Sequence, residues 1–521
     1  MLRRWFVCLA FATWCFANTW VELAEGDGIY YARYNPLRTV VVPVLCWEIL
    51  LALGIFGTWE WCRRRGYGKA LLPHVLLLAS SLVPLGIAAL AFLRSVPFDL
   101  VPIVRKPLFW PIVLALGIVP AGMAILRPVQ ASRALRALYL YSWPVLALIL
   151  FSAARTSLYY PDAAYADGQT APALSGPPPR IRVVWVIFDE LSQAIVFDHR
   201  PPHLACPNFD KLRDQSFFAT AARSPGDSTE TSMPGLILGD KVVEAVPQGP
   251  NRLLLRTKQH QEQFSWDSAP NVFDDARQLG FDSALAGWFH PYGRVIHRSL
   301  TRCDWTAGWL LSGIEEPFQL ESWPHAMWDR ARLQIAVLPL IGHLPGMFPG
   351  AHHRIEKAVR FSWLLDRSRK FAADPAIGLV LIHLPVPHPP AFYDRTKGVI
   401  TATGAVGYPD SVALADRTLG LLRESIEQAG LWDRTALLVS ADHGWRTSMW
   451  RGTAEWTPEE ESLSHYRTSG APFLLRFPGQ TATVPYSPRF NTVMTRRIIA
   501  GILGGQFTTA QQLVERLEAG L

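Results

Sequence analysis

Five apolar segments occupy the first 155 residues and constrain the fold more than any other feature. They cover residues 5–23, 39–61, 70–93, 108–126 and 136–154. Each is close to the ~20 residues that a helix needs to cross a bilayer. A signal peptide would account only for the first segment, and no small-residue cleavage pattern follows it cleanly. The sequence therefore predicts a transmembrane domain of five helices in residues 1–155.

The lysines and arginines between these segments predict their orientation. Five lie in the first and third connections: Arg33, Arg38, Arg94, Arg105 and Lys106. Nine lie at the N-terminus and in the second and fourth connections: Arg3, Arg4, Arg63, Arg64, Arg65, Lys69, Arg127, Arg133 and Arg136. The richer side is predicted to be cytoplasmic, so five crossings place everything after residue 155 outside.

The remaining charges and cysteines exclude some classes of protein. The net charge is +7, but the basic residues form no long run. Membrane topology therefore explains the positive charge better than nucleic-acid binding does. Six cysteines do not make a disulfide scaffold, although a single bond between Cys206 and Cys303 stays open. Glu48, near the middle of the second segment, is either a functional group or an acid bonded to a neighbouring helix.

The composition and the pattern of apolar residues change after residue 155. Residues 160–180 are rich in Pro, Gly and Ala, which predicts an extended linker within 156–181. From residue 182 to residue 521, apolar strands alternate with amphipathic helices. This pattern predicts an α/β domain with a mostly parallel central sheet flanked by helices.

Three apolar strands of this domain end in acids or histidines. The strands are 181–188, 377–382 and 435–440, and the groups that follow them are Asp189 and Glu190, His383 and His388, and Asp442 and His443. Residues 410–430 fit a crossover helix, and parallel sheets gather ligands at the carboxyl ends of their strands. Each group alone also fits a cap, a rigid loop or a turn, with Gly444 supplying positive φ. Their coincidence favours a divalent metal such as Zn²⁺ or Mn²⁺.

The stretch "SPGDSTETSMPGLILG" (224–239) offers a nucleophile for such a site. Thr229 stands at the expected start of a helix, where the dipole and nearby N–H groups favour an alkoxide and an attached phosphoryl group. The alternative is that Ser228 or Thr229 is merely the N-cap.

Taken in order, these motifs resemble the sulfatase-like branch of the alkaline phosphatase superfamily, over about residues 182–480. "ADRTLGLLRESIEQAGLWDRTALLVSADHG" is the most specific part, and "HLPVPHPPAFYDR" looks like a loop of membrane phosphoethanolamine transferases. Those enzymes and the lipoteichoic acid synthases also have five N-terminal spans. Sulfatases have a motif that leads from the nucleophile to a Leu-Leu-Thr-Gly-like end, and matching that end to "LILG" places the nucleophile at Thr229. Phosphoethanolamine transferases have a threonine five residues before a proline, and counting back from Pro234 gives Thr229 again.

The resemblance implies a role for each candidate residue. It implies a metal site with Zn²⁺ favoured and Mn²⁺ or Ca²⁺ as alternatives, and its ligands would be Asp189, Thr229, Asp442 and His443, with Glu190 as an extra ligand. It implies phosphate binding or a second metal, together with proton transfer, for His388 and His465, and substrate binding also for His383. "TETSM" (229–233) lacks the Cys/Ser, Pro and Arg of formylglycine sulfatases, and Trp445 replaces the acid that often follows "DHG".

The expected function is a metal-dependent transfer of a phospho-head-group, of phosphoethanolamine or phosphoglycerol type. The donor would be a membrane phospholipid, the covalent carrier Thr229, and the acceptor an envelope lipid or glycan. The expected location is a bacterial inner membrane, with the N-terminus in the cytoplasm and the catalytic domain in the periplasm. One alternative is a phosphate or sulfate ester hydrolase, and another is a non-catalytic protein that binds lipid or glycan. No protein partner is predicted.

Overall fold

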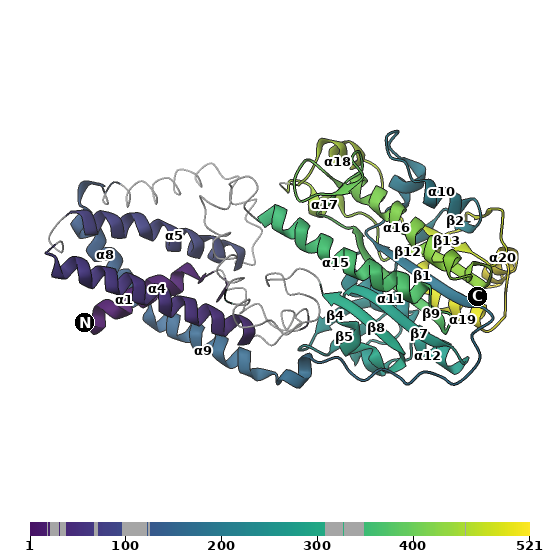
Figure 1. The fold of residues 1–521 in the computed structure, drawn as a ribbon, viewed down its shortest axis with the longest axis horizontal. Coiled ribbons are helices and arrows are strands. Elements are labelled where there is room, and N and C mark those ends of the chain that lie inside the picture. Colours follow the sequence, from purple (N-terminus) through teal and green to yellow (C-terminus); the bar gives the residue numbers. More distant parts are fainter. Residues whose placement is uncertain are drawn as a thin grey trace. The chain divides into compact units, whose positions relative to one another are not determined.

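The structure of the protein is a computed structural model that describes residues 1–17, 19–20, 31, 38–66, 71–95, 122, 125–307, 327, 349–453 and 455–520. The chain divides into two units, drawn as ribbons in Figure 1. Unit 1 comprises Met1–Ile29, Asn35–Asp162 and Leu311–Pro349, and unit 2 comprises Tyr30–Tyr34, Ala163–Leu310 and Gly350–Leu521. A short segment from the N-terminal part of the chain thus belongs to unit 2.

Unit 1 is helical in the part that the structure describes. Its helices are α1 (Leu2–Cys15), α4 (Arg38–Arg64), α5 (Leu72–Ser95), α8 (Pro128–Tyr141) and α9 (Trp143–Tyr159). Two stretches are long and apolar enough to cross a membrane, namely Val41–Arg64 and Pro128–Ser152. The second of these runs over the junction between α8 and α9.

The described residues therefore supply two candidate spans instead of the five predicted. These two correspond to the predicted spans 39–61 and 136–154. The predicted span 5–23 overlaps α1, which has 14 residues, and residues 18 and 21–23 of that span lie outside the described residues. Span 70–93 overlaps α5, which contributes the shorter apolar helix Pro73–Ile87. Most of span 108–126 lies outside the described residues.

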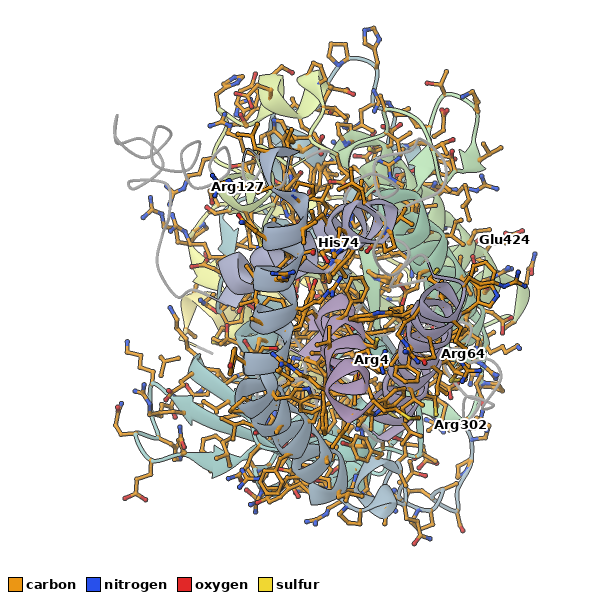
Figure 2. All side chains as sticks on the ribbon, turned by 90° about the vertical axis from the view of Figure 1, so that its left-hand side faces the viewer. Arg4, Arg64, His74, Arg127, Arg302 and Glu424 are labelled. Atoms are coloured by element: carbon orange, nitrogen blue, oxygen red, sulfur yellow. The ribbon has the colours of Figure 1, made fainter. Side chains whose placement is uncertain are left out.

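Polar contacts join α1 to α4 within unit 1. Glu60, near the end of α4, lies 3.2 Å from Arg4 and 3.8 Å from Arg64, and Figure 2 labels these two arginines on their helices. The buried carboxyl group of Glu48 accepts a hydrogen bond from the Thr13 hydroxyl of α1 at 3.3 Å. Of the two interpretations of Glu48, the structure thus supports an acid bonded to a neighbouring helix.

Unit 2 is built on an eight-stranded sheet with the order β14-β2-β13-β12-β1-β9-β7-β8. The strands are β1 (Arg182–Asp189), β2 (Phe217–Ala219), β7 (Asp282–Phe289), β8 (Arg302–Ala307), β9 (Ile377–Pro387), β12 (Thr435–Ala441), β13 (Phe473–Arg476) and β14 (Val484–Tyr486). The run from β12 to β8 is parallel throughout, and only β13 is antiparallel to its neighbours. The predicted α/β domain with a mostly parallel sheet is confirmed.

Helices cover both faces of this sheet, which explains why its central strands are apolar without alternation. In β1, Val183, Trp185 and Ile187 belong to one core, and the residues between them belong to the other. The first core includes residues of α11 (Thr229–Leu238), α12 (Val272–Gln278), α19 (Thr495–Leu503) and α20 (Ala510–Glu518). The second includes residues of α10 (Pro207–Arg213), α15 (Pro349–Ala372) and α16 (Tyr408–Gln428).

Smaller elements complete unit 2. The additional strands are β3 (Ala222–Arg223) with β15 (Phe490–Asn491), β4 (Val242–Pro247) with β5 (Leu253–Thr257) and β6 (Phe264–Ser265), and β10 (Tyr393–Asp394) with β11 (Val399–Ile400). The additional α-helices are α13 (Tyr292–Val295), α17 (Thr447–Trp450) and α18 (Pro458–Leu463).

The segment predicted as a linker is docked along unit 2. The backbone N–H of Gly168 donates to the carbonyl of Gly293, and that of Ala171 donates to the carbonyl of Leu300, both at 2.8 Å. Beyond the one-turn helix Asp162–Tyr165, the stretch up to Arg180 contains no helix or strand. Composition did not indicate that this segment would be hydrogen-bonded to other residues of unit 2.

Cys206 and Cys303 are both free. Cys206 precedes α10 and lies in the second core, whereas Cys303 belongs to β8 and packs against the first core. The two thiols are therefore on opposite faces of the sheet, so the disulfide left open by the sequence does not form.

Candidate active site

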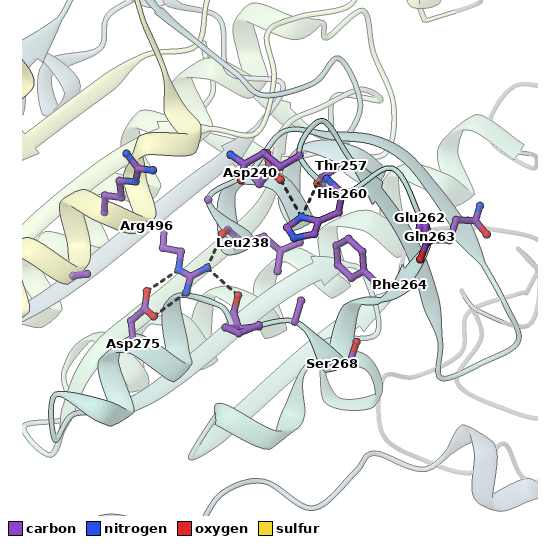
Figure 3. Close-up of a pocket in the computed structure, with 16 residues that line it drawn as sticks. Leu238, Asp240, Thr257, His260, Glu262, Gln263, Phe264, Ser268, Asp275 and Arg496 are labelled. Atoms are coloured by element: carbon purple, nitrogen blue, oxygen red, sulfur yellow. Dashed lines mark hydrogen bonds and ion pairs between the residues drawn. The ribbon is translucent and has the colours of Figure 1, made fainter. Parts of the chain in front are cut away.

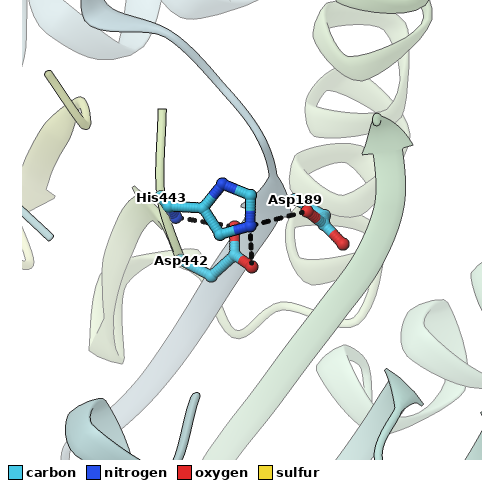
Figure 4. Close-up of side chains that lie close together, drawn as sticks. All are labelled: Asp189, Asp442 and His443. Carbon is cyan, nitrogen blue, oxygen red and sulfur yellow. Dashed lines mark hydrogen bonds and ion pairs between the residues drawn. The ribbon is translucent and has the colours of Figure 1, made fainter. Parts of the chain in front are cut away.

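Asp189 and Asp442 lie at the same level of the sheet because β1 and β12 run parallel. Phe188 is paired with Ala441, so the next residue along each strand is an aspartate. One side-chain atom of each aspartate and of the following His443 lies within 4.8 Å of the other two (Figure 4). All three side chains are buried. We refer to Asp189, Asp442 and His443 as the acid-histidine trio.

Thr229 joins this trio from another part of the chain. Its hydroxyl donates to Asp442 Oδ2 at 2.7 Å and lies 3.3 Å from His443 Nε2. Thr229 is the first residue of α11, and Ser228 before it has the extended backbone of an N-cap. The N-cap alternative therefore applies to Ser228, which leaves the buried Thr229 hydroxyl facing the trio.

The two aspartates differ in their electrostatic surroundings. Burial raises the pKa of Asp189 well above its ordinary value, and the neighbouring Asp442 and Glu190 carboxylates add to the shift. Burial also acts on Asp442, but His443, His383 and the Thr229 hydroxyl outweigh it and lower its pKa. Without a cation, a proton on Asp189 relieves the repulsion between these adjacent carboxylates.

Glu190 is not a member of the trio, and its role as an extra ligand stays a prediction. Its carboxylate accepts hydrogen bonds from Arg446 and from Trp450 Nε1, the latter at 2.9 Å. Its backbone N–H instead donates to Asp442 Oδ1 at 3.1 Å. The backbone of Glu190 has a φ of 64°, a left-handed conformation that is uncommon outside glycine. In the structure, Glu190 orients a trio member through its backbone.

His388 lies at the same edge of the sheet, and its backbone N–H donates to the carbonyl of Asp189 at 3.0 Å. Its Nδ1–H donates to the carbonyl of Pro389, and its Nε2 accepts from Arg446 Nη2 at 3.3 Å. Burial, together with the charges of Lys357 and Arg446, lowers the pKa of His388 well below its ordinary value. The hydrogen bonds thus assign a neutral imidazole whose Nε2 lone pair faces Arg446.

The other two predicted histidines have different surroundings. His383 is buried, with its Nδ1 3.1 Å from the Tyr292 hydroxyl, and burial lowers its pKa to about 4. His465 is exposed and packs against Tyr466, with ring centroids 4.0 Å apart. Among the described residues, no contact joins His465 to the trio, so the structure does not bring this predicted residue to the site.

Gly444 is required for a reason other than the predicted positive φ, which it does not have. A Cβ atom at this position would lie 2.2 Å from the carbonyl oxygen of Thr468. Trp445 is buried and stacks on Tyr408, with ring centroids 4.2 Å apart. The close approach of the backbone, not the turn itself, therefore requires glycine after His443.

Sequence reasoning missed three residues of this site. Trp288 Nε1 donates to Asp189 Oδ2 at 2.8 Å, and His290 Nε2 lies 3.2 Å from the carbonyl oxygen of Thr229. Arg446 links Glu190 to His388. Trp288 and His290 could have been found, since the apolar run of β7 also ends in a histidine. Nothing in the sequence marked Arg446 as a residue of the site except its position shortly after "DHG".

A separate hollow of about 880 Å³ is lined by Leu238, the last residue of α11, and is drawn in Figure 3. Asp240, His260, Phe264 and Arg496 are among its other lining residues. The Arg496 guanidinium pairs with Asp275 at 2.6 Å. None of the predicted site residues lines this hollow.

A model of one known protein family matches a part of the chain that includes Asp442 and His443. Residues 247–494 match the family described as type I phosphodiesterase / nucleotide pyrophosphatase. The match covers 248 of the 521 residues. The matched region contains Asp442 and His443, whereas Asp189 and Thr229 precede it.

Solved structures similar to the chain include a phosphonate monoester hydrolase of Agrobacterium radiobacter. It is 14% identical, with a TM-score of 0.40 over 62% of this chain and 74% of the other. The PsFucS1 sulfatase from Pseudoalteromonas sp. is 17% identical, with a TM-score of 0.40 over 63% and 68%. An alkaline phosphatase superfamily protein from Vibrio parahaemolyticus is 13% identical, with a TM-score of 0.38 over 66% and 73%. No curated protein matches the sequence.

The acid-histidine trio has the donor types and spacing to hold a metal ion. Within the described residues, the buried Asp189 Oδ1 has no hydrogen-bond partner. A buried carboxylate oxygen without a donor is costly, and a bound cation would supply the missing partner. Two carboxylates and an imidazole suit a divalent ion, and these donors do not by themselves select one metal.

The raised pKa of Asp189 predicts how a metal-free protein responds to pH. Because the folded state holds this proton more tightly than the unfolded state, stability is lost as the pH rises above the ordinary value of ~3.9 toward the folded pKa. With chelator present, Asp189→Asn should raise the unfolding midpoint at pH 7 by about 2–4 °C for each kcal/mol of relief. This gain over the unmodified protein should shrink toward pH 4, as thermal unfolding at several pH values would reveal. A pH-independent difference would contradict the assignment of the proton.

Proposed function

We propose that this protein is a membrane-anchored, metal-dependent enzyme that cleaves a phosphodiester through a covalent intermediate on Thr229. We further propose that it transfers a phospho-head-group, of phosphoethanolamine or phosphoglycerol type, from a phospholipid to an envelope lipid or glycan. The first statement names only the reaction, which is attack of a hydroxyl nucleophile on a phosphodiester. The second statement also names the donor and the acceptor of the transferred group.

One observation carries the proposal. The buried Thr229 hydroxyl at the start of α11 lies 2.7 Å from Asp442 Oδ2 and 3.3 Å from His443 Nε2. A threonine with only a capping role would turn its hydroxyl toward the free N–H groups of the helix. Here the hydroxyl turns toward acceptors instead, and a phosphoryl group on Thr229 would lie at the positive end of α11.

The reaction would proceed in two balanced displacements. The Thr229 oxygen attacks phosphorus as its proton passes to the Asp442 carboxylate, and the bond to the diacylglycerol oxygen breaks. That oxygen takes up a proton from solvent. An acceptor hydroxyl then attacks the same phosphorus and releases its proton to solvent, the bond to Thr229 breaks, and the hydroxyl of Thr229 is restored with the proton held by Asp442.

The surrounding residues would hold the phosphate during both steps. A divalent cation, with Zn²⁺ favoured over Mn²⁺ and Ca²⁺, when bound by Asp189, Asp442 and His443, supplies Lewis-acid stabilisation of the charge on the phosphoryl oxygens. Arg446, partly exposed beside His388, is suited to bind a non-bridging phosphate oxygen. Since His388 carries its proton at Nδ1, we assign it to orienting Arg446 instead of protonating the leaving group.

A lipid donor fits the membrane character of unit 1. The two candidate spans support attachment to a membrane, and from the distribution of basic residues we propose an inner-membrane protein with a cytoplasmic N-terminus and an extracytoplasmic unit 2. Anchoring would place the catalytic unit beside its lipid substrate and let the released diacylglycerol return to the bilayer.

The second candidate function is hydrolysis of an external phosphate or sulfate ester, with water as the acceptor. The match to phosphodiesterases and nucleotide pyrophosphatases favours this alternative for a phosphodiester substrate. The two candidates share the Thr229 intermediate and differ only in what attacks it.

Purified full-length protein incubated with vesicles of phosphatidylethanolamine and phosphatidylglycerol separates these functions. We expect release of diacylglycerol, measured by lipid mass spectrometry, and a head-group phosphate adduct on the intact protein. A stoichiometric yield of free phosphoethanolamine or glycerol phosphate without any added acceptor would identify a hydrolase. Turnover of bis(4-nitrophenyl) phosphate without release of diacylglycerol would reject the phospholipid donor. Absence of both bound metal and turnover would indicate a non-catalytic protein.

A further inference from the structure

Tyr31 stands apart from its neighbours in the sequence because it belongs to unit 2. It falls between α1 and α4 in the chain, yet its side chain is buried in the first core of the catalytic unit. The backbone carbonyl of Tyr31 accepts a hydrogen bond from Arg294 Nη2 at 2.9 Å. Both its ring and its backbone are therefore held by residues of the catalytic unit.

The hydroxyl of Tyr31 contacts His290, which in turn contacts the backbone of Thr229, the proposed nucleophile. Tyr31 Oη is 2.8 Å from His290 Nδ1, and His290 Nε2 is 3.2 Å from the carbonyl oxygen of Thr229. A carbonyl oxygen only accepts, so Nε2 carries the proton, and Nδ1 of the neutral ring accepts from the tyrosine hydroxyl. Burial lowers the pKa of His290 to about 3, which keeps the ring neutral.

The chain of hydrogen bonds from Tyr31 through His290 to Thr229 has one defined orientation. The Trp266 ring packs edge-on against His290 at 5.1 Å between centroids, which limits rotation of the imidazole. The Thr229 carbonyl fixes the proton on Nε2, and the Tyr31 hydroxyl, by donating to Nδ1, holds the ring in that position. The bond from His290 Nε2–H orients the peptide group of Thr229, and with it the direction of the hydroxyl.

We propose that Tyr31, which falls between α1 and α4 in the chain, is a positioning residue for the nucleophile. It acts through His290, whose ring it holds by a hydrogen bond to Nδ1, on the carbonyl of Thr229. This inference rests on the proposed function of Thr229 as the nucleophile. It adds that the catalytic unit is incomplete without a residue that precedes α4.

Tyr31→Phe in the full-length protein tests this inference, because the change removes one oxygen and keeps the ring. With bis(4-nitrophenyl) phosphate and saturating Zn²⁺, we expect kcat to fall about tenfold and KM to change less than about twofold. The adduct on Thr229 should form more slowly by the same factor in intact-mass measurements. Metal content and the thermal midpoint should match those of the control Tyr486→Phe, a buried tyrosine of the same core.

A double-mutant cycle shows whether the effect passes through His290. In a His290→Phe background, which removes both hydrogen bonds, Tyr31→Phe should change kcat less than about twofold. An equal loss in both backgrounds, or an unchanged kcat in Tyr31→Phe alone, would overturn the inference while Thr229-dependent turnover persists. If the unmodified protein and Thr229→Ala show the same turnover, the proposed function itself fails, which is a different result.

Discussion

Thr229→Ala is expected to reduce kcat/KM for a phosphodiester by at least on the order of 10⁴-fold, which corresponds to about 5.5 kcal/mol of transition-state stabilisation. The variant lacks the oxygen that forms the covalent bond, and the remaining groups of the site cannot replace it. Intact mass should show a phosphoryl adduct on the unmodified protein and none on Thr229→Ala. The change keeps the backbone helical, so the thermal midpoint should move little.

Two further variants serve as controls for the expected effect of Thr229→Ala. Thr229→Ser keeps a hydroxyl at the start of α11 and should retain activity within about tenfold, because it loses a methyl group and some rotamer restriction. Thr231→Ala removes a hydroxyl that bonds only to Ser228 within the described residues, and it should have nearly normal turnover. Activity of Thr229→Ala equal to that of Thr231→Ala would remove Thr229 from the mechanism.

Asp442→Asn is expected to abolish stoichiometric metal binding. Loss of an outer partner of a metal ligand costs about 10–100-fold in affinity, so loss of a charged ligand should cost at least the upper end of that range. Metal analysis after dialysis and titration with Zn²⁺ would measure the loss. At a free-ion concentration of ~1,000 times the Kd, the ion stabilises the unmodified protein by about 4 kcal/mol. Asp442→Asn should lose this stabilisation.

Glu190→Gln is the matched control, since it removes a buried carboxylate next to the trio. Its carboxylate pairs with Arg446 and Trp450, so Glu190→Gln should keep its bound metal even if the pairing with Arg446 weakens. Loss of metal from Glu190→Gln to the same extent as from Asp442→Asn would restore Glu190 as a ligand. Retention of metal by both variants would place the ion outside the trio.

The parts of the site that could be predicted from sequence are those that follow from strand periodicity. β1, β9 and β12 are continuous apolar runs because both faces of a central parallel strand are buried. Polar residues directly after such strands must lie at one edge of the sheet. Asp189, Asp442 and His443 therefore came together as predicted, and Thr229 was correctly placed at the start of a helix.

The contacts that periodicity could not predict depend on side-chain direction, which it does not encode. Glu190 follows Asp189 directly, but its backbone is left-handed and its carboxylate pairs with Arg446 and Trp450. His465 lies in the expected order along the chain, and yet it is exposed against Tyr466.

The sequence by itself determined the architecture of the catalytic domain and the residues at one edge of its sheet. Burial of apolar surface and the two-residue period of a strand are local properties, and they can be read from consecutive residues. Only the tertiary structure decided which polar atoms face each other. Tyr31 and His290 are 259 positions apart in the chain, and their contact depends on the packing of segments that share no local pattern. For this reason the place of Thr229 at the start of a helix could be predicted from the sequence, but its hydrogen-bond connection to His290 and Tyr31 could not.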